Sequence, residues 1–258
     1  MSTPLEDKEV PRKLRKAFEK EKKKARARAL HSQPLRKINT QGLQYLRKSL
    51  GLLSDSQKVD TLDAVFIAID FEYSNFSAKT GRIRLREVGI STLDTRDTRY
   101  KEPGKIISSQ HYRTVMDTKE FLFGVSIDTT QDDLVSLLKH LLYPENNSGK
   151  QPRQLILVGH GFSFEIQVLR GLGINLALAP IVENILDTHY LGIEVFGQDF
   201  SLSRLTRQLG LEGSHFHNVG NDAKFSLRAM LLLATHNLLE AESSQQSRSE
   251  IYERIARF

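Results

Sequence analysis

Two carboxylates, those of Asp70 and Glu72, follow an apolar run of six residues, Ala64–Ile69. Such a run is typical of a strand that is buried on both faces. Because successive side chains of a strand alternate between its faces, Asp70 and Glu72 are expected to point the same way. Two carboxylates at the end of a buried strand repel one another, and a divalent cation between them removes that penalty. The pair is therefore a candidate metal site, although an Asp-x-Glu triplet alone is commonly a solvated turn.

A second group of chemically capable residues consists of His217 and Asp222, in the sequence HNVGND. Asp222 lies where a loop enters a long helix expected over 222–239. An acid is favoured there by the free N–H groups and the macrodipole of the helix, so Asp222 alone has a structural explanation. A single histidine in a loop is, by itself, commonly exposed or locally hydrogen-bonded.

The third candidate is Glu165, in the sequence VGHGFSFE. It falls in the first turn of a helix expected over 163–172, after a short apolar strand at 155–158, and it has the same helix-start explanation. Gly159 and Gly161 permit a tight turn from strand to helix. The segment does not fit a phosphate-binding loop or a dinucleotide-binding fingerprint, and the chain has no Gly-x-Ser-x-Gly motif for an acyl-transfer serine.

The elements that must position these residues alternate between strand and helix patterns. Arg82, Arg84 and Arg86 are expected on one face of a second strand (82–91), with Ile83 and Leu85 on the other. This arginine face could follow a nucleic-acid backbone, or it could discourage edge pairing. The other expected elements are an amphipathic helix through Leu43, Leu46 and Leu50, a third strand at 111–116, helices at 132–143 and 201–209, a strand or strand edge within 184–191, and a short terminal helix after the polar stretch 240–250. This order predicts an α/β fold, a mixed sheet flanked by helices.

The charge of the chain is concentrated at its beginning. The 258 residues carry 37 Lys and Arg against 31 Asp and Glu, and residues 1–28 hold 11 and 5 of these, so the net +6 lies wholly in that segment. We therefore expect a charged, basic arm over 1–40, helical (12–30) or disordered, and a body over 41–258; residues 29–258 carry 26 Lys and Arg against 26 Asp and Glu and are neutral as a whole. Lys20–Arg28 could contact phosphates, bind a protein or act as a nuclear localisation signal, or it could simply be solvated.

Composition excludes several kinds of chemistry. Cysteine is absent, so the chain has no disulfides, no thiolate nucleophile and no Cys-based zinc site. The longest apolar runs are six residues, whereas a membrane span needs about 20. No apolar segment typical of a secretory signal follows the N-terminus. These features predict an intracellular protein of the cytoplasm or nucleus, with no membrane partner.

The three acidic segments together resemble the motifs of the DEDD superfamily of 3′–5′ exonucleases, which have a ribonuclease-H-like fold. Asp70 and Glu72 match the first motif, GHGFSFE matches Gly-His-Asn-x-x-Phe-Asp, and His217 with Asp222 matches the His-x-x-x-x-Asp of the histidine-containing DEDDh branch. The segments REVGIS and LDTHYL also agree, and the resemblance covers about residues 60–240. EFLFGVS (120–126) and HNVGNDA are most similar to the fungal good-for-full-DBP-activity type of domain.

The resemblance implies a metal-dependent hydrolysis. Asp70, Glu72 and Asp222 would hold Mg²⁺ or Mn²⁺, with Asp70 shared between two ions, His217 would be the general base, and Glu165 would orient water. The product would be a nucleoside 5′-monophosphate released from a single-stranded nucleic acid, RNA rather than DNA. Two family positions differ here, because Glu165 replaces an aspartate and Gly161 an asparagine.

The substrate pocket implied by the family is lined by the backbone near Phe71 and Tyr73 and by the side chain of His160. Aromatic residues beside a buried strand are commonly part of the core instead. The departures at Glu165 and Gly161, with the neutral body, motivate an alternative function. In that alternative the chain is a catalytically weakened exonuclease fold that binds RNA or a protein partner.

Overall fold

One mixed sheet organises the chain. The computed structural model describes residues 37–53, 63–77, 82–116, 118–143, 153, 155–238 and 243–258. The sheet has the order β4-β3-β2-β1-β5-β6; β1, β2 and β3 are antiparallel, whereas β5 and β6 run parallel to β1 and β4 runs parallel to β3. The strands are β1 (Val65–Ser77), β2 (Arg82–Asp94), β3 (Ile107–Arg113), β4 (Ile127–Asp128), β5 (Leu155–Gly159) and β6 (Val182–Asp187). This topology confirms the α/β, ribonuclease-H-like fold class.

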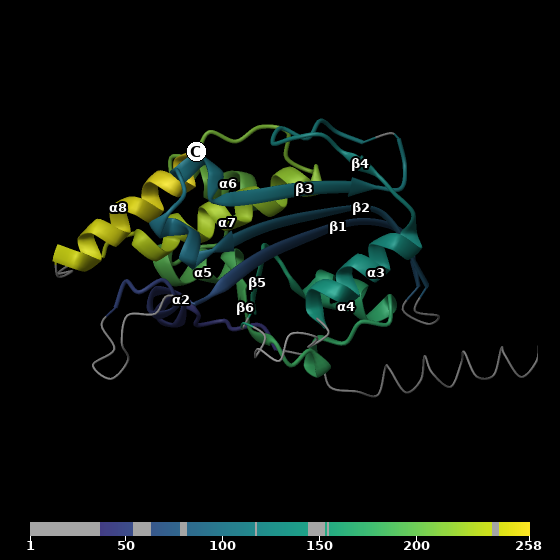
Figure 1. The fold of residues 1–258 in the computed structure, drawn as a ribbon, viewed down its shortest axis with the longest axis horizontal. Coiled ribbons are helices and arrows are strands. Elements are labelled where there is room, and N and C mark those ends of the chain that lie inside the picture. The colour runs from purple at the N-terminus through teal and green to yellow at the C-terminus, as the bar shows by residue number, and fades with distance from the viewer. Residues whose placement is uncertain are drawn as a thin grey trace, which may run out of the picture.

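Helices cover both faces of the sheet (Figure 1). They are α2 (Leu43–Ser49), α3 (Gln131–Leu142), α4 (Ser163–Gly171), α5 (Thr188–Phe196), α6 (Leu202–Gln208), α7 (Val219–Thr235) and α8 (Ser243–Arg257). Short 3₁₀ turns occur at Thr95–Arg99, Pro103–Lys105 and Leu176–Leu178. One apolar cluster joins the sheet to α7 and its neighbouring helices, and a second joins the opposite face to α3 and α4. The two clusters hold the sheet between the helical layers.

The first strand is longer than its apolar run predicts. β1 continues through Ser77, so Asp70 lies inside the strand rather than at its end, which corrects the sequence prediction. The parallel neighbour β5 pairs with β1 only as far as Ala68, opposite Val158. Asp70 therefore lies two residues beyond the last residue of β1 that pairs with β5, in the part of β1 that continues by antiparallel pairing with β2. The acids still lie where the buried part of the strand ends.

A β-bulge in β2 interrupts the expected alternation of arginines. Glu72 is opposite Glu87, but Tyr73 is opposite Leu85, which leaves Arg86 as the extra residue. Because of this shift, Leu85 joins Val88 in the same apolar cluster, although simple alternation would place them on opposite faces. The arginines of β2 are therefore not one regular stripe.

Other boundaries also differ from the sequence predictions. The segment 188–196 is helix α5 rather than strand, because Asp187 caps it by accepting a hydrogen bond from the backbone N–H of His189. α7 begins at Val219, three residues before the predicted start, because Asn218 is its N-cap. The terminal helix is not short, since α8 spans 15 residues. The predicted arm helix lies outside the described residues. No helix among the described residues is long and apolar enough to cross a membrane.

Gly89→Ala is expected to lower the free energy of unfolding by about 3 kcal/mol. A Cβ atom at position 89 would lie 1.9 Å from the carbonyl oxygen of Val219, so α7 would have to move away from the sheet. Urea denaturation measures the effect. Gly104→Ala is the control, because its Cβ would have no neighbour nearer than 3.6 Å, and a change of less than about 0.5 kcal/mol is expected. Equal effects of the two substitutions would refute this account of the packing.

Candidate active site

The close contact between β2 and α7 brings two of the acids together. Asp70 is directly opposite Gly89 in the sheet, and residues directly opposite share a face. The first turn of α7 passes over Gly89, since a Cβ there would collide with the backbone of Val219. Asp222 lies on that first turn, three residues further along. The absence of a side chain at position 89 thus lets Asp222 approach Asp70, and the Glu-x-Gly pattern of REVG has a physical role in the site.

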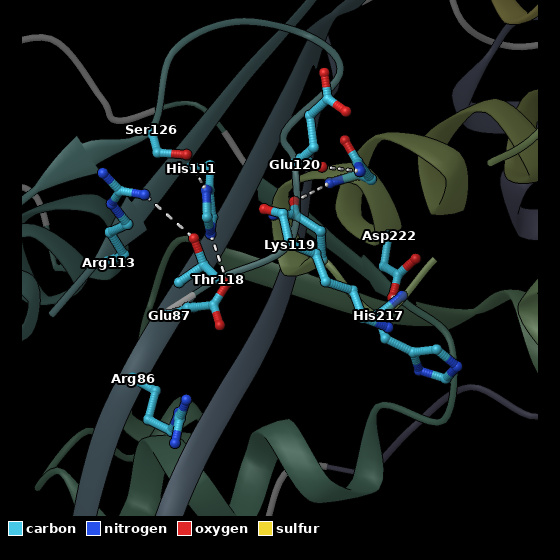
Figure 2. Close-up of polar contacts among 12 residues, drawn as sticks. Arg86, Glu87, His111, Arg113, Thr118, Lys119, Glu120, Ser126, His217 and Asp222 are labelled. Atoms are coloured by element: carbon cyan, nitrogen blue, oxygen red, sulfur yellow. Dashed lines mark hydrogen bonds and ion pairs between the residues drawn. The ribbon is translucent and has the colours of Figure 1, made fainter. Parts of the chain in front are cut away.

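The five-residue spacing between His217 and Asp222 has a local cause. The backbone N–H of His217 donates a hydrogen bond of 2.9 Å to Oδ2 of Asp222, so the carboxylate reaches back over the N-cap. His217 adopts a left-handed backbone conformation with φ of 66° to make this turn. Its side chain is exposed, and the imidazole extends away from the Asp222 carboxylate (Figure 2). The other carboxylate oxygen of Asp222, Oδ1, is buried and has no hydrogen-bond partner among the described residues.

Glu165 is positioned by the turn between β5 and α4. Gly161 has φ of +78°, and a Cβ there would meet nothing within 4 Å. Glycine and asparagine are the residues that adopt this conformation most readily, which explains how glycine can stand where the resembling family has asparagine. Glu165 then falls in the first turn of α4, where it is 8% exposed, and within the part of the chain that the structure describes its Oε2 has no hydrogen-bond partner.

Asp187, which the sequence prediction did not include, holds this turn in place. Its Oδ1 accepts hydrogen bonds from the backbone N–H groups of Gly161 (2.9 Å) and His189 (3.0 Å), and its Oδ2 accepts one from that of Phe162 (2.8 Å). The side chain is 1% exposed. Asp187 therefore joins the end of β6 to the start of α4. The only sequence signal for it was its place in LDTHYL, where an acid precedes a helix.

The predicted substrate residues are mostly occupied by contacts inside the protein. One ring nitrogen of His160, Nδ1, lies 3.0 Å from Oγ1 of Thr188, and Nε2 lies 3.0 Å from the carbonyl oxygen of Phe200. Phe71 is buried in the apolar cluster on the α3 and α4 side, and Tyr73 packs against the same cluster. The backbone of β1 at these two positions continues past Asp70, beside the acids.

Burial raises the pKa of three acids of the site, and one of them, Asp70, is also raised by its acidic neighbours. Burial raises the pKa of Asp70 well above its ordinary value, and the charges of Glu165, Asp222 and Glu72 raise it further. Burial also raises the pKa of Glu165 to about 7. For Asp222 burial raises the pKa to about 6, opposed by the hydrogen bond from His217 and by the charges of His217 and Lys119. Asp70 is thus the acid that feels the charges of the other three, although they come from three different elements.

A buried polar chain lies next to Glu72 on the same face of the sheet. Glu87 is directly opposite Glu72, and its Oε2 lies 2.9 Å from Nε2 of His111, which is fully buried. The other ring nitrogen of His111 lies 2.8 Å from Oγ of Ser126. Figure 2 shows His111 between Ser126 and Glu87. The contact with His111 gives the Glu87 carboxylate a partner of its own where it lies opposite Glu72. Sequence reasoning missed this chain, because its members are on three separate segments.

The four acids fit a divalent cation by donor type and charge. Carboxylate oxygens are the ligands that Mg²⁺ and Mn²⁺ prefer. Two of the oxygens, Oε2 of Glu165 and Oδ1 of Asp222, are buried and have no partner in the described ranges, and a buried polar atom of this kind calls for an ion or a water molecule. Among the described residues no three His, Asp or Glu side chains converge closely enough to form a metal-binding group by themselves. The acids are therefore neighbours that a cation could draw together.

Asp187→Asn is expected to lower the free energy of unfolding by about 2–4 kcal/mol. An asparagine amide has one acceptor oxygen, so its NH₂ group would face a backbone N–H of the β5–α4 turn, and a buried donor would lose its partner. Thermal or urea denaturation measures the loss. Asp199→Asn is the matched control, because Asp199 also interacts with α5 but its side chain is 75% exposed, so its effect should stay below about 1 kcal/mol. A loss no larger than that of the control would show that Asp187 does not clamp the turn.

Comparison with known families places the chain in one of them. A family model named DEDDh_C, described as DNA polymerase III subunit epsilon-like, C-terminal domain, matches residues 65–233. The chain belongs to this family and has the fold of DEDDh 3′–5′ exonucleases. The matched residues run from the start of β1 almost to the end of α7 and include all five predicted catalytic positions.

Two fungal proteins are similar to the chain over most of its length. An uncharacterized nucleolar protein of Schizosaccharomyces pombe is 29% identical over 187 residues, which cover 67% of this chain and 70% of that protein. An uncharacterized protein of Saccharomyces cerevisiae is 26% identical over 229 residues, which cover 75% of this chain and 44% of that protein. The chain thus spans less than half of the second relative.

Among solved structures, the nuclease domain of 3′hExo, a DEDDh family member, bound to rAMP, has 15% identity and a TM-score of 0.44, with 72% of this chain and 99% of that chain covered. Schizosaccharomyces pombe Pop2p in its Mg²⁺ and Mn²⁺ bound form has 13% identity and a TM-score of 0.38, with 80% and 94% covered.

Proposed function

We propose that the protein is a metal-dependent 3′–5′ exonuclease that hydrolyses the terminal phosphodiester of single-stranded RNA. The observation that carries this proposal is the grouping of Glu72, Glu165 and Asp222 around Asp70, with two buried carboxylate oxygens that no described residue hydrogen-bonds. Glu165 is buried and Asp70 and Asp222 are half-buried, so assembling these like charges costs stability. A site that retains this cost is a candidate for cation-assisted catalysis.

Asp70, Glu72 and Asp222 would hold Mg²⁺ or Mn²⁺, with Asp70 shared between two ions, and the ions would supply positive charge to the scissile phosphate and make water more acidic. His217 would take the proton of the attacking water on an imidazole nitrogen. Its exposed ring can turn toward the substrate, while its backbone N–H stays on Asp222. Glu165, fixed in the first turn of α4, would orient the water. The products would be nucleoside 5′-monophosphates.

The proposed substrate path uses the backbone at Phe71 and Tyr73 and the region of His160. We propose that the chain has two regions: an arm over 1–40 that contacts phosphates or a protein, and an exonuclease domain over 41–258. We propose an intracellular location, in the cytoplasm or nucleus. The Schizosaccharomyces pombe relative carries the word nucleolar in its name, which is compatible with this location.

The test uses two labelled forms of one RNA and DNA of the same sequence, each with Mn²⁺ or with EDTA. A 3′–5′ exonuclease converts 5′-labelled RNA into a ladder of shortened products and releases the label of 3′-labelled RNA as a mononucleotide from the start. We expect both results with Mn²⁺, faster on RNA than on DNA, and neither with EDTA. Asp70→Asn, purified in the same way, is the control for contaminating nucleases. Equal products from wild type and Asp70→Asn would refute the catalytic proposal.

The second candidate is a catalytically weakened exonuclease fold that binds RNA or a protein partner. It is favoured by the glutamate at position 165 and by the spread of the acids, which do not form a metal-binding group among the described residues. Under this function, wild type would leave RNA intact, Asp70→Asn would bind it as well as wild type, and removal of residues 1–35 would weaken binding in a salt-dependent way.

A further inference from the structure

The loop that follows β3 is fastened to the first turn of α7, the turn that carries Asp222. The N-cap residue Asn218 donates a hydrogen bond from Nδ2 to the carbonyl oxygen of Lys119 (2.8 Å). Asn221 donates from Nδ2 to the carbonyl oxygen of Glu120 (2.9 Å) and accepts from the backbone N–H of Leu122 (2.9 Å). Both asparagines are fully buried. Residues 119–124, named here the Lys119 loop, are therefore held at fixed positions over α7.

Aromatic contacts fasten the same loop a second time. The centre of the Phe121 ring lies 5.5 Å from that of the His111 ring. A Cβ atom on Gly220 would lie 2.8 Å from the Phe121 ring, so the Lys119 loop is in direct contact with α7. The Nζ atom of Lys224 lies 4.2 Å from the centre of the Phe123 ring, a cation–π contact to a second aromatic of the loop. A loop with this many buried attachments is a rigid part of the site rather than a mobile cover.

This attachment determines where the Lys119 side chain lies. It extends from the loop toward the backbone of His217, beside Asp222 (Figure 2). Its Nζ donates a hydrogen bond of 3.2 Å to the carbonyl oxygen of Phe216. An ammonium group has three N–H donors, and Lys119 is exposed, so donors remain for a ligand. Because its hydrogen-bond partner is a neutral carbonyl rather than a carboxylate, the positive charge of Lys119 is not cancelled by that contact.

We propose that Lys119 is a substrate-binding residue of this site, and that its ammonium group binds a phosphate of the single-stranded nucleic acid whose 3′ end lies at the four carboxylates. The proposal rests on the proposed function. Asp70, Glu72, Glu165 and Asp222 repel a polyanion wherever no cation is bound to them, so a fixed positive charge at their edge would help to hold the chain near them. An ammonium group suits this role, because it binds phosphate as a compact charge without a demand for one orientation.

The competing role for Lys119 is purely structural. Its hydrogen bond to Phe216 could serve only to hold the turn that carries His217. A residue with that role would change the rate and the pH profile of catalysis but would leave the affinity for nucleic acid unchanged. Binding measurements in the absence of cleavage separate the two roles.

The experiment measures binding of 5′-fluorescein-labelled oligo(U) RNA by fluorescence anisotropy, with full-length protein carrying Asp70→Asn so that cleavage does not interfere. Adding Lys119→Met is expected to weaken binding about 5-fold and to reduce the slope of log K against log[salt] by about 0.7, the contribution of one phosphate on a single strand. Adding Lys119→Arg should preserve the slope. Lys105→Met is the matched control. Lys105 is an exposed lysine that pairs with Glu102 and lies just before the start of β3, whereas Lys119 follows the end of that strand.

Unchanged affinity and slope in the Lys119→Met variant would overturn the proposal, as would an equal change with Lys105→Met. Loss of binding in both Lys119→Met and Lys119→Arg, together with a lower melting temperature, would show that position 119 supports the fold of the site as a whole rather than binding a phosphate, and would also overturn it. If wild type cleaves no RNA but the selective effect of Lys119→Met on binding persists, the exonuclease proposal fails and the phosphate-binding role is supported.

Discussion

Asp70→Asn is expected to lower the rate of 3′-terminal hydrolysis by at least about 1000-fold, or about 4 kcal/mol in transition-state stabilisation. Asp70 is the acid that the other three surround, and it is the one proposed to bind both ions. An asparagine keeps the shape of the side chain but lacks the charge. Single-turnover assays with 5′-labelled RNA and Mn²⁺ measure the rate.

The same substitution is expected to raise the melting temperature in EDTA, because in the folded chain Asp70 must either keep a proton or hold a charge beside three other acids, and asparagine avoids both costs. Opposite effects on activity and stability are the signature of a residue kept for function. Asp132→Asn, at an exposed position in the first turn of α3, is the control and should leave the rate unchanged. A loss of both activity and stability in Asp70→Asn would show instead that Asp70 supports the fold.

Without metal, the free energy of unfolding is expected to fall as the pH rises from about 5 to about 8. Burial raises the pKa of Glu165 to about 7 and that of Asp222 to about 6. The folded protein therefore keeps protons that the unfolded chain has already released, and a higher pH favours the unfolded chain. The penalty is absent below the ordinary pKa of these groups and complete above their raised values. For Glu165, which is 8% exposed, it amounts to about 3 kcal/mol at most.

Urea denaturation in EDTA across this pH range measures the effect. Glu165→Gln should flatten the dependence, whereas Glu212→Gln, at an exposed loop position, should not change it. Saturating Mn²⁺ should restore stability at high pH, by about 2.7 kcal/mol at 100 times its dissociation constant, since the ions bind ionised carboxylates of the folded state. A stability that rises with pH in EDTA would contradict the shared burial of these acids.

The sequence alone was sufficient to predict the fold class, because the fold class depends on the type and order of the elements, and local periodicity indicates both. The apolar run before Asp70, the run at 155–158 and the leucine spacing of 132–143 each predict an element that the structure contains. Element ends were less predictable. β1 continues past its apolar run because pairing with β2 satisfies its backbone, and α7 starts early because Asn218 caps it. Neither the pairing with β2 nor the cap at Asn218 can be predicted from the hydrophobic pattern of the element that it extends.

The same distinction applies to the site. Residue type, spacing and the family resemblance singled out the acids as candidates and matched His217 with Asp222, and the structure shows a local backbone hydrogen bond between these two residues. The tertiary structure decided which groups surround them. Asp187 reaches the turn of Glu165 across 26 residues, and Lys119 reaches the turn of His217 across 97. Such contacts depend on how α7 packs over Gly89 and how β6 lies beside β5. Local sequence patterns contain no information about that packing. The acids and the chemistry proposed for them could therefore be inferred from the sequence, whereas the groups around them could not.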